Sequence, residues 1–106
     1  MLLLVAATML MVSCSKDNED LIVGTWKTTS CTWTDDYNNL AIWRYAANGD
    51  FEFQYHGETM YGFYTIDGDE LTMTIDNDPE TVTITDISAT TMTWKMKRGN
   101  MTLRKI

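Results

Sequence analysis

Few side chains of this sequence have the types and the spacing that chemistry requires. The chain contains one histidine, His56, and two cysteines, Cys14 and Cys31. His56 has no histidine or cysteine neighbour at metal-ligand spacing, and no recognisable base accompanies Cys31, which we expect to be a small buried or half-buried side chain. No nucleophile elbow, phosphate-binding loop or paired-carboxylate arrangement occurs. We therefore predict that the protein is not an enzyme and that it holds neither a metal ion nor a cofactor.

Carboxylates gather in one short segment, residues 76–80, which reads Asp-Asn-Asp-Pro-Glu. Oxygen ligands at alternating positions suit calcium, but the segment lacks the glycine and the distal glutamate of an EF-hand loop. We interpret it as an acidic turn between two strands. The whole chain is also acidic, with a formal net charge of −7 and a pI near 4.4. Because nucleic acids and anionic lipid surfaces require a basic footprint, we predict no nucleic-acid partner and no electrostatic docking on lipid.

Cys14 follows an uncharged apolar run, Met1–Val12. The run has the length of the hydrophobic region of a signal peptide and is too short to cross a bilayer as a helix. With the small residue Ser13 before it, Cys14 resembles the lipobox of bacterial lipoproteins. The resemblance implies cleavage before Cys14 and attachment of lipid to its sulfur and its new amino group. The alternatives are a chance cysteine after an ordinary signal peptide, or a buried N-terminal helix.

The residues that follow Cys14 are polar and charged. Residues 15–20 read Ser-Lys-Asp-Asn-Glu-Asp, which indicates a solvated tether. They also resemble the acidic export signals of Bacteroidetes surface lipoproteins. This resemblance implies a lipid-anchored protein of the bacterial outer membrane, displayed outward rather than facing the periplasm. We therefore divide the chain into a signal peptide (1–13), a lipidated cysteine with its tether (14–20) and one domain (21–106).

The domain alternates apolar and polar residues with a period of two almost throughout, as half-buried strands do. Threonine fills many of the polar positions, and its β-branched side chain favours a pleated sheet. The predicted strands lie at residues 21–33, 41–47, 50–56, 59–66, 70–75, 80–86, 91–97 and 101–106. We predict no helix after residue 20.

Short turns join these strands. Asn48-Gly49 is a typical two-residue hairpin turn, and residues 67–69 and 98–100 each contain a glycine that accepts a positive φ. Sequential hairpins favour an up-and-down barrel, which closes the sheet and removes its edges, over a two-sheet sandwich. The sequence thus predicts an all-β fold, an eight-stranded antiparallel up-and-down barrel. We expect a monomer.

Three blocks of the domain carry a family resemblance. They read Leu-Ile-Val-Gly-Thr-Trp-Lys (21–27), Asn-Gly-Asp-Phe (48–51) and Gly-Phe-Tyr-Thr-Ile-Asp-Gly-Asp-Glu-Leu-Thr-Met (62–73). They resemble the small lipocalin-like domains of Bacteroidetes lipoproteins, and the resemblance covers residues 21–106. It implies a lipocalin-like barrel that is non-catalytic and binds a small hydrophobic molecule in or at the mouth of the barrel.

The resemblance also implies structural roles for three residues. In lipocalins the tryptophan of a Gly-x-Trp motif packs across the closed end of the barrel, and a basic residue near the last strand stacks on it. The matching residues here are Gly24, Trp26 and Arg104. A guanidinium group over an indole ring contributes about 0.5–2 kcal/mol. The chain lacks the C-terminal helix and the large loops of full lipocalins.

The inward rows of the predicted barrel are rich in aromatic residues and methionine. They comprise Phe51, Phe53, Tyr55, Tyr61, Phe63, Met73, Met92, Trp94 and Met96. These rows could line a pocket for a small hydrophobic molecule, since methionine adapts to varied ligands, or they could simply be the core. The predicted ligand-binding residues are Trp43, Tyr45, Phe53, Tyr55, Tyr61, Phe63, Met73 and Trp94.

The longest predicted loop, residues 34–40, supports an alternative function. Trp33, Tyr37, Trp43 and Tyr45 lie in it or beside it. These aromatic side chains could rim a pocket, contact a protein or a glycan, or form a hydrophobic lid over the barrel end. In the alternative, the core is filled and the protein is an interaction module that binds a protein or a glycan through its loops at the cell surface.

Overall fold

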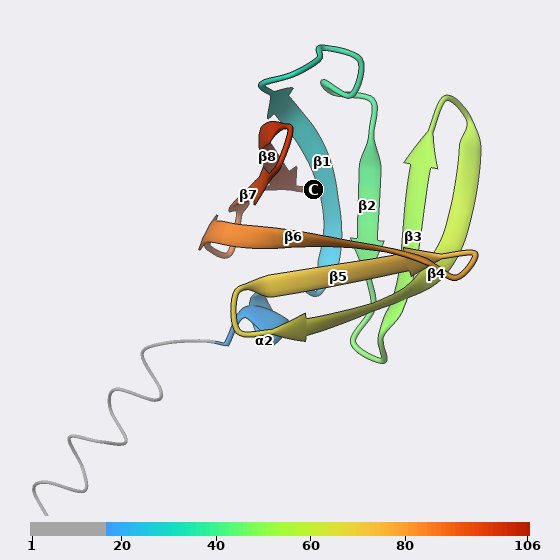
Figure 1. The fold of residues 1–106 in the computed structure, drawn as a ribbon, viewed down its shortest axis with the longest axis vertical. Helices are drawn as coiled ribbons and strands as arrows, with labels where there is room; N and C mark the ends of the chain where they lie inside the picture. The colour runs from blue at the N-terminus through green and yellow to red at the C-terminus, as the bar shows by residue number, and fades with distance from the viewer. Residues whose placement is uncertain (1–16) are drawn as a thin grey trace, which may run out of the picture.

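The structure, a computed structural model, describes residues 17–106 (Figure 1). The predicted signal peptide, Cys14 and the first residues of the tether lie outside the described residues. The elements are α2 (Asn18–Leu21), β1 (Gly24–Cys31), β2 (Ile42–Tyr45), β3 (Asp50–Tyr55), β4 (Glu58–Asp67), β5 (Glu70–Ile75), β6 (Asp78–Ile87), β7 (Thr91–Met96) and β8 (Gly99–Lys105). Within this part of the chain, no helix has the length and apolar character that crossing a membrane requires.

The strands close into a barrel in chain order, and every neighbouring pair is antiparallel. Pairing of β1 with β8, which includes Trp26 opposite Lys105, completes the closure. Asp76 and Asn77 both have positive φ angles, 53° and 64°, as the two-residue hairpin turn between β5 and β6 requires. The predicted all-β, eight-stranded up-and-down barrel is therefore confirmed.

The start of the domain differs from the prediction. Strand β1 begins at Gly24 rather than at residue 21, because Asn18–Leu21 forms the helical turn α2. The Asn18 side-chain amide donates a hydrogen bond to the carbonyl oxygen of Gly68 at 2.8 Å. Asn18, which belongs to the predicted solvated tether, therefore contacts the barrel at the turn between β4 and β5.

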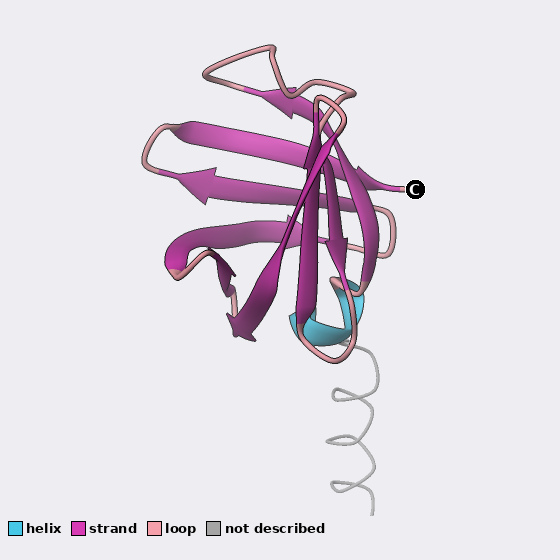
Figure 2. Cartoon of the chain, turned by 90° about the vertical axis from the view of Figure 1, so that its right-hand side faces the viewer, coloured by secondary structure: helices cyan, strands magenta, loops and turns pink. Residues whose placement is uncertain are grey.

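Side chains on the inner face fill most of the barrel. The largest fully buried ones include Trp26, Trp94, Tyr45 and Phe51. Cys31 is buried too and forms no disulfide within the described chain, which confirms the prediction of a small buried side chain. Helix α2 lies at one end of the barrel, the closed end, and the loop of residues 32–41 lies at the other end, the mouth (Figures 1 and 2).

Strand β4 bends where it passes from one neighbour to the next. Its first half pairs with β3, and its pairing with β5 begins only at Phe63 and Thr74. Gly62 lies at this bend, and a Cβ atom there would overlap the backbone carbonyl of Thr74. Glycine is therefore the residue that permits this close approach. Residues 58–62 have no partner on the β5 side, and the β3–β4 and β5–β6 hairpins diverge toward the mouth (Figure 1).

Candidate ligand-binding site at the barrel mouth

A cleft of about 550 Å³ lies at the mouth, where these two hairpins diverge, and we call it the mouth cleft. The lining residues are Tyr37, Trp43, Phe51, Phe53, Met60, Met73, Ile75, Asp76, Asp78 and Glu80. Most of these side chains are aromatic or apolar, and the last three are acidic. Apolar walls with a few polar groups are typical of sites for small molecules.

Aromatic rings form one wall of the mouth cleft. The ring centroids of Trp43 and Phe53 are 4.3 Å apart, and the ring of Tyr37 meets that of Phe53 edge-on at 6.4 Å. Trp43 pairs with Phe53 across β2 and β3, which places both rings on the inner face of the barrel. Trp43 Nε1 also donates a hydrogen bond to the Thr28 hydroxyl oxygen at 2.9 Å. This bond and the ring contacts fix the wall before any ligand binds.

Buried polar atoms support the floor of the mouth cleft. The hydroxyl of Tyr45 donates a hydrogen bond to the sulfur of Met73 at 3.2 Å. Burial raises the pKa of Tyr45 well above its usual value of 10.0, and the nearby phenol of Tyr64 adds to the effect, so Tyr45 stays a neutral donor. Trp94 meets Trp43 edge-on at 4.9 Å, and its indole N–H has no hydrogen-bond partner among the described residues.

Three carboxylates border the other side of the mouth cleft. Asp76 lies in the turn before β6, and Asp78 and Glu80 lie on β6 itself. Glu80 is 3.6 Å from the guanidinium group of Arg98, and both side chains are more than half exposed, so the pair contributes little to stability. Among residues 17–106, no three His, Cys, Asp or Glu side chains are grouped so that they could hold a metal ion. We therefore treat these carboxylates as charges that face the cleft.

The structure brings part of the predicted ligand-binding set together. The predicted residues that line the mouth cleft are Trp43, Phe53 and Met73. The predicted residues that are fully or almost fully buried are Tyr45 and Trp94. The ring of Tyr55 meets that of the cleft residue Tyr37 edge-on at 5.0 Å, and its hydroxyl donates a hydrogen bond to the carbonyl oxygen of Asp36. Tyr55 therefore holds the loop that carries Tyr37.

The prediction that Tyr61 and Phe63 face inward is wrong. They are 68% and 55% exposed, and they lie on the outer face of β4. Tyr64 takes the inward position, because it pairs with the buried Met73 of β5, and Gly62 shares that face. Both alternating sets of residues on β4 contain large apolar side chains. A period of two alone therefore could not decide which set faced the core.

Sequence reasoning missed two kinds of cleft residue. Met60 lies on the same face of β4 as Tyr64, which is the face that the prediction assigned to the outside. Asp78 and Glu80 belong to the predicted acidic turn, and the prediction gave them no place in a binding site. Both of them continue, toward the mouth, the alternation that places Val82 inside the barrel. That continuation was the signal that could have found them.

Comparisons with known proteins bear on the fold. No protein-family model and no curated protein sequence matches this chain. A solved structure of a lipocalin-like protein from Bacteroides uniformis superposes with a TM-score of 0.67 at 14% identity, over 81% of this chain and 99% of that one. The described chain therefore has a lipocalin-like barrel fold. An uncharacterized protein from Bacteroides eggerthii gives a TM-score of 0.70 at 15% identity, over 80% and 99% of the two chains.

These likenesses confirm the resemblance drawn from the sequence at the level of the fold. The fold alone does not name a ligand, and the clefts of this chain are what can indicate one.

The closed end of the lipocalin-like barrel corrects a second prediction. Trp26 is fully buried there, and its Nε1 donates a hydrogen bond to the carbonyl oxygen of Ile22 at 2.8 Å. Lys105, not Arg104, covers the indole, with its Nζ 5.0 Å from the ring centroid. Arg104 is exposed, because it pairs with Lys27 on the outer face. The prediction for Arg104 is therefore wrong by one position, although Trp26 is placed as the resemblance implies.

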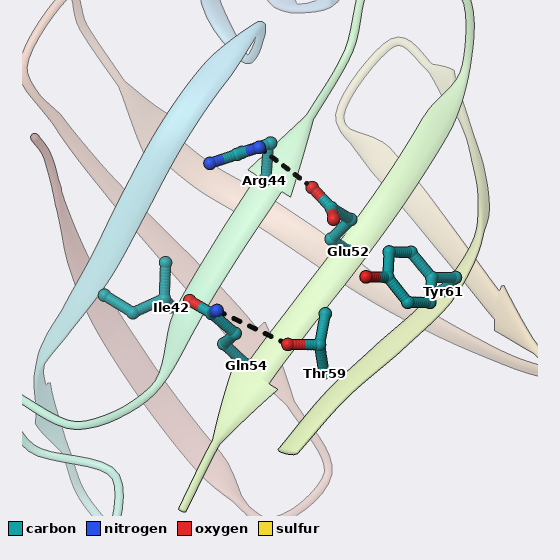
Figure 3. A pocket seen from close by; sticks show the side chains of 6 residues that line it. All are labelled: Ile42, Arg44, Glu52, Gln54, Thr59 and Tyr61. Atoms are coloured by element: carbon teal, nitrogen blue, oxygen red, sulfur yellow. Dashed lines mark hydrogen bonds and ion pairs between the residues drawn. The ribbon is translucent and has the colours of Figure 1, made fainter. Parts of the chain in front are cut away.

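A second hollow lies on the outer face of the lipocalin-like barrel (Figure 3). Its lining residues are Ile42, Arg44, Glu52, Gln54, Thr59 and Tyr61. Arg44 and Glu52 form an ion pair at 3.1 Å, and the Gln54 amide donates a hydrogen bond to the Thr59 hydroxyl at 3.3 Å. The hollow measures only about 100 Å³, and an adjoining one of about 500 Å³ shares Arg44, Glu52 and Tyr61. Because most polar groups here satisfy one another, the mouth cleft is the stronger candidate site.

Proposed function

We propose that this lipocalin-like barrel binds a small hydrophobic molecule in its mouth cleft. The observation that carries the proposal is a cleft, lined mostly by aromatic and other apolar side chains, that stays open at one end of an otherwise packed barrel. Its volume of about 550 Å³ falls within the usual range for small-molecule sites, about 300–1,000 Å³. The buried side chains of Tyr45 and Trp94 keep the ligand at the mouth rather than in the barrel centre.

We also propose that the protein is a lipoprotein of the bacterial outer membrane, displayed outward. Support comes from the sequence: the apolar run, the small residue before Cys14, and the acidic residues after it. In this proposal residues 1–13 are removed, and lipid on Cys14 anchors a non-catalytic, monomeric binding domain.

Two substitutions on one strand test the site. Met60 lines the mouth cleft, and its neighbour Tyr61 points to the outer face. We expect Met60→Thr to weaken binding of the neutral probe 1-naphthylmethanol about fivefold, because the substitution removes apolar contact area. Isothermal titration calorimetry on the full chain in lipid nanodiscs, with empty nanodiscs as the blank, measures the dissociation constants.

Tyr61→Thr is the matched control, and it should leave the dissociation constant of 1-naphthylmethanol unchanged. If Tyr61→Thr weakened binding and Met60→Thr did not, the site would lie on the outer face instead. If the wild-type protein did not bind the probe at all, the proposal of a hydrophobic ligand would fail.

The alternative, an interaction module that binds through its loops, has less support from the geometry. Tyr37 packs edge-on against Phe53 and Tyr55. The guanidinium carbon of Arg98 lies 5.5 Å from the ring centroid of Trp33. Both loop rings are therefore engaged within the fold. Capture of a defined protein or glycan that is insensitive to Met60→Thr would favour the alternative.

A further inference from the structure

Along the inner face of β6, buried apolar side chains are replaced by exposed carboxylates toward the mouth. Ile84 and Val82 are buried in the barrel, as inward positions of a strand should be. The next two positions of the same parity are Glu80 and Asp78. Glu80 pairs with Met73 of β5, which is almost fully buried, and cross-strand partners lie on one face of a sheet. The two carboxylates therefore belong to the inner row.

Carboxylates at inner positions need a physical reason, because they add nothing to an apolar core. Asp78 and Glu80 are exposed to water through the mouth cleft, so their placement costs little in the free protein. Glu80 has only the weak, exposed pair with Arg98, and no ion pair forms at Asp78 or Asp76 within residues 17–106. Their oxygens are thus open to a ligand that enters the cleft.

The wall across from these carboxylates suits a positive charge as well as an apolar body. Aromatic rings attract cations to their faces, and Trp43, Phe53 and Tyr37 all line the cleft. The formal net charge of −7 adds a long-range attraction for cations and a repulsion for anions.

We propose that the mouth cleft selects a hydrophobic cation, a small molecule with an aromatic or aliphatic body and a positively charged nitrogen. The body lies against the aromatic wall and Met73, and the nitrogen faces Asp78 and Glu80. This inference rests on the proposed function, because it concerns the ligand of the same cleft.

Three probes with one ring system and different charges test the inference. They are 1-naphthylmethylammonium, 1-naphthylmethanol and 1-naphthoate. Titration calorimetry uses the full chain in nanodiscs of zwitterionic phosphatidylcholine, with empty nanodiscs to subtract partitioning into lipid. We expect the ammonium probe to bind about tenfold more tightly than the alcohol, and the carboxylate probe most weakly. The preference for the ammonium probe should shrink as salt is raised, since the carboxylates are solvent-exposed.

Isosteric substitutions test whether Asp78 and Glu80 cause the preference for the ammonium probe over the alcohol. The double variant Asp78→Asn with Glu80→Gln should bring the ammonium and alcohol probes to within about twofold of each other, because the ammonium probe loses its two carboxylate partners. Asp86→Asn removes an exposed carboxylate of the same strand that does not line the cleft, and it should keep the full preference. Far-ultraviolet circular dichroism checks that each variant is folded, and the comparison of probes on the wild type needs no variant.

The outcomes separate this inference from the proposed function. Equal binding of the alcohol and the ammonium probe by the wild type would overturn the cation inference and leave hydrophobic binding standing. Binding of none of the three probes would overturn both. A double variant that kept the preference would overturn the roles of Asp78 and Glu80.

Discussion

At the closed end, a single lysine joins three parts of the chain. The ammonium group of Lys105 lies over the ring of Trp26 and donates a hydrogen bond to the carbonyl oxygen of Leu21 at 3.1 Å. Its side chain passes over Gly24, where a Cβ atom would come within 3.0 Å of it. Gly24 also has a φ of 138°, which other residues rarely adopt, so the glycine of the Gly-x-Trp motif is required by its backbone conformation and also leaves room for the lysine that covers the tryptophan.

Substitution of this lysine tests that role. We expect Lys105→Met to lower the free energy of unfolding by about 1–2 kcal/mol, because it removes both the cation–π contact and the hydrogen bond. Arg104→Met, next to it on the outer face, should change the free energy by less than about 0.5 kcal/mol. Urea unfolding followed by tryptophan fluorescence measures both. A larger effect at Arg104 than at Lys105 would contradict the assignment.

At the scale of elements, the bend in β4 positions the mouth cleft. Gly62 lets β4 approach Thr74 closely at the point where β4 parts from β5. The parting of the two hairpins leaves Met60 on one side and Ile75 on the other, and both line the cleft. A side chain at residue 62 would push apart two strands that must meet there.

We expect Gly62→Ala to destabilise the barrel by about 1–3 kcal/mol, since a backbone carbonyl must move to admit the methyl group. Thr65→Ala provides a matched control on the same strand, at an exposed outer position, and should change stability by less than about 0.5 kcal/mol. Urea unfolding monitors both variants. Equal stability of Gly62→Ala and the wild type would show that the strands can separate freely at the bend.

Local patterns predicted the strands and their order, but they could not assign every face. The alternation of β3 acts over a few residues and holds in the structure. The two-residue turn predicted at Asn48-Gly49 does not form, because the N–H of Gly49 donates to the carbonyl oxygen of Ala46 and only Gly49 of the predicted pair has a positive φ. The pairing that sets Lys105 opposite Trp26 joins β8 to β1, more than 70 residues away in the chain. The cleft likewise depends on where strands separate. These are non-local properties, and a period of two does not contain them.

At the scale of the whole molecule, the proposed lipid anchor on Cys14 would set the position of the barrel in the cell. We expect Cys14→Ala to move the protein from the membrane fraction to the soluble fraction and to remove a lipid adduct from its mass spectrum. Cys31→Ala changes the other cysteine, which is buried in the barrel, and should leave the adduct in place. Fractionation and intact-mass spectrometry measure both effects. A wild-type protein without lipid would contradict the proposed anchor.

The described chain enters the barrel at the closed end, opposite the loop of residues 32–41 at the mouth (Figures 1 and 2). Asp17 is three residues after Cys14, a span of about 10 Å at most when extended. A lipid on Cys14 would therefore hold the closed end near the membrane surface and turn the cleft toward the surrounding water. A ligand would then enter the cleft from aqueous solution and not directly from the lipid bilayer. The geometry thus favours molecules that are apolar enough to leave water for the cleft and polar enough to travel through it.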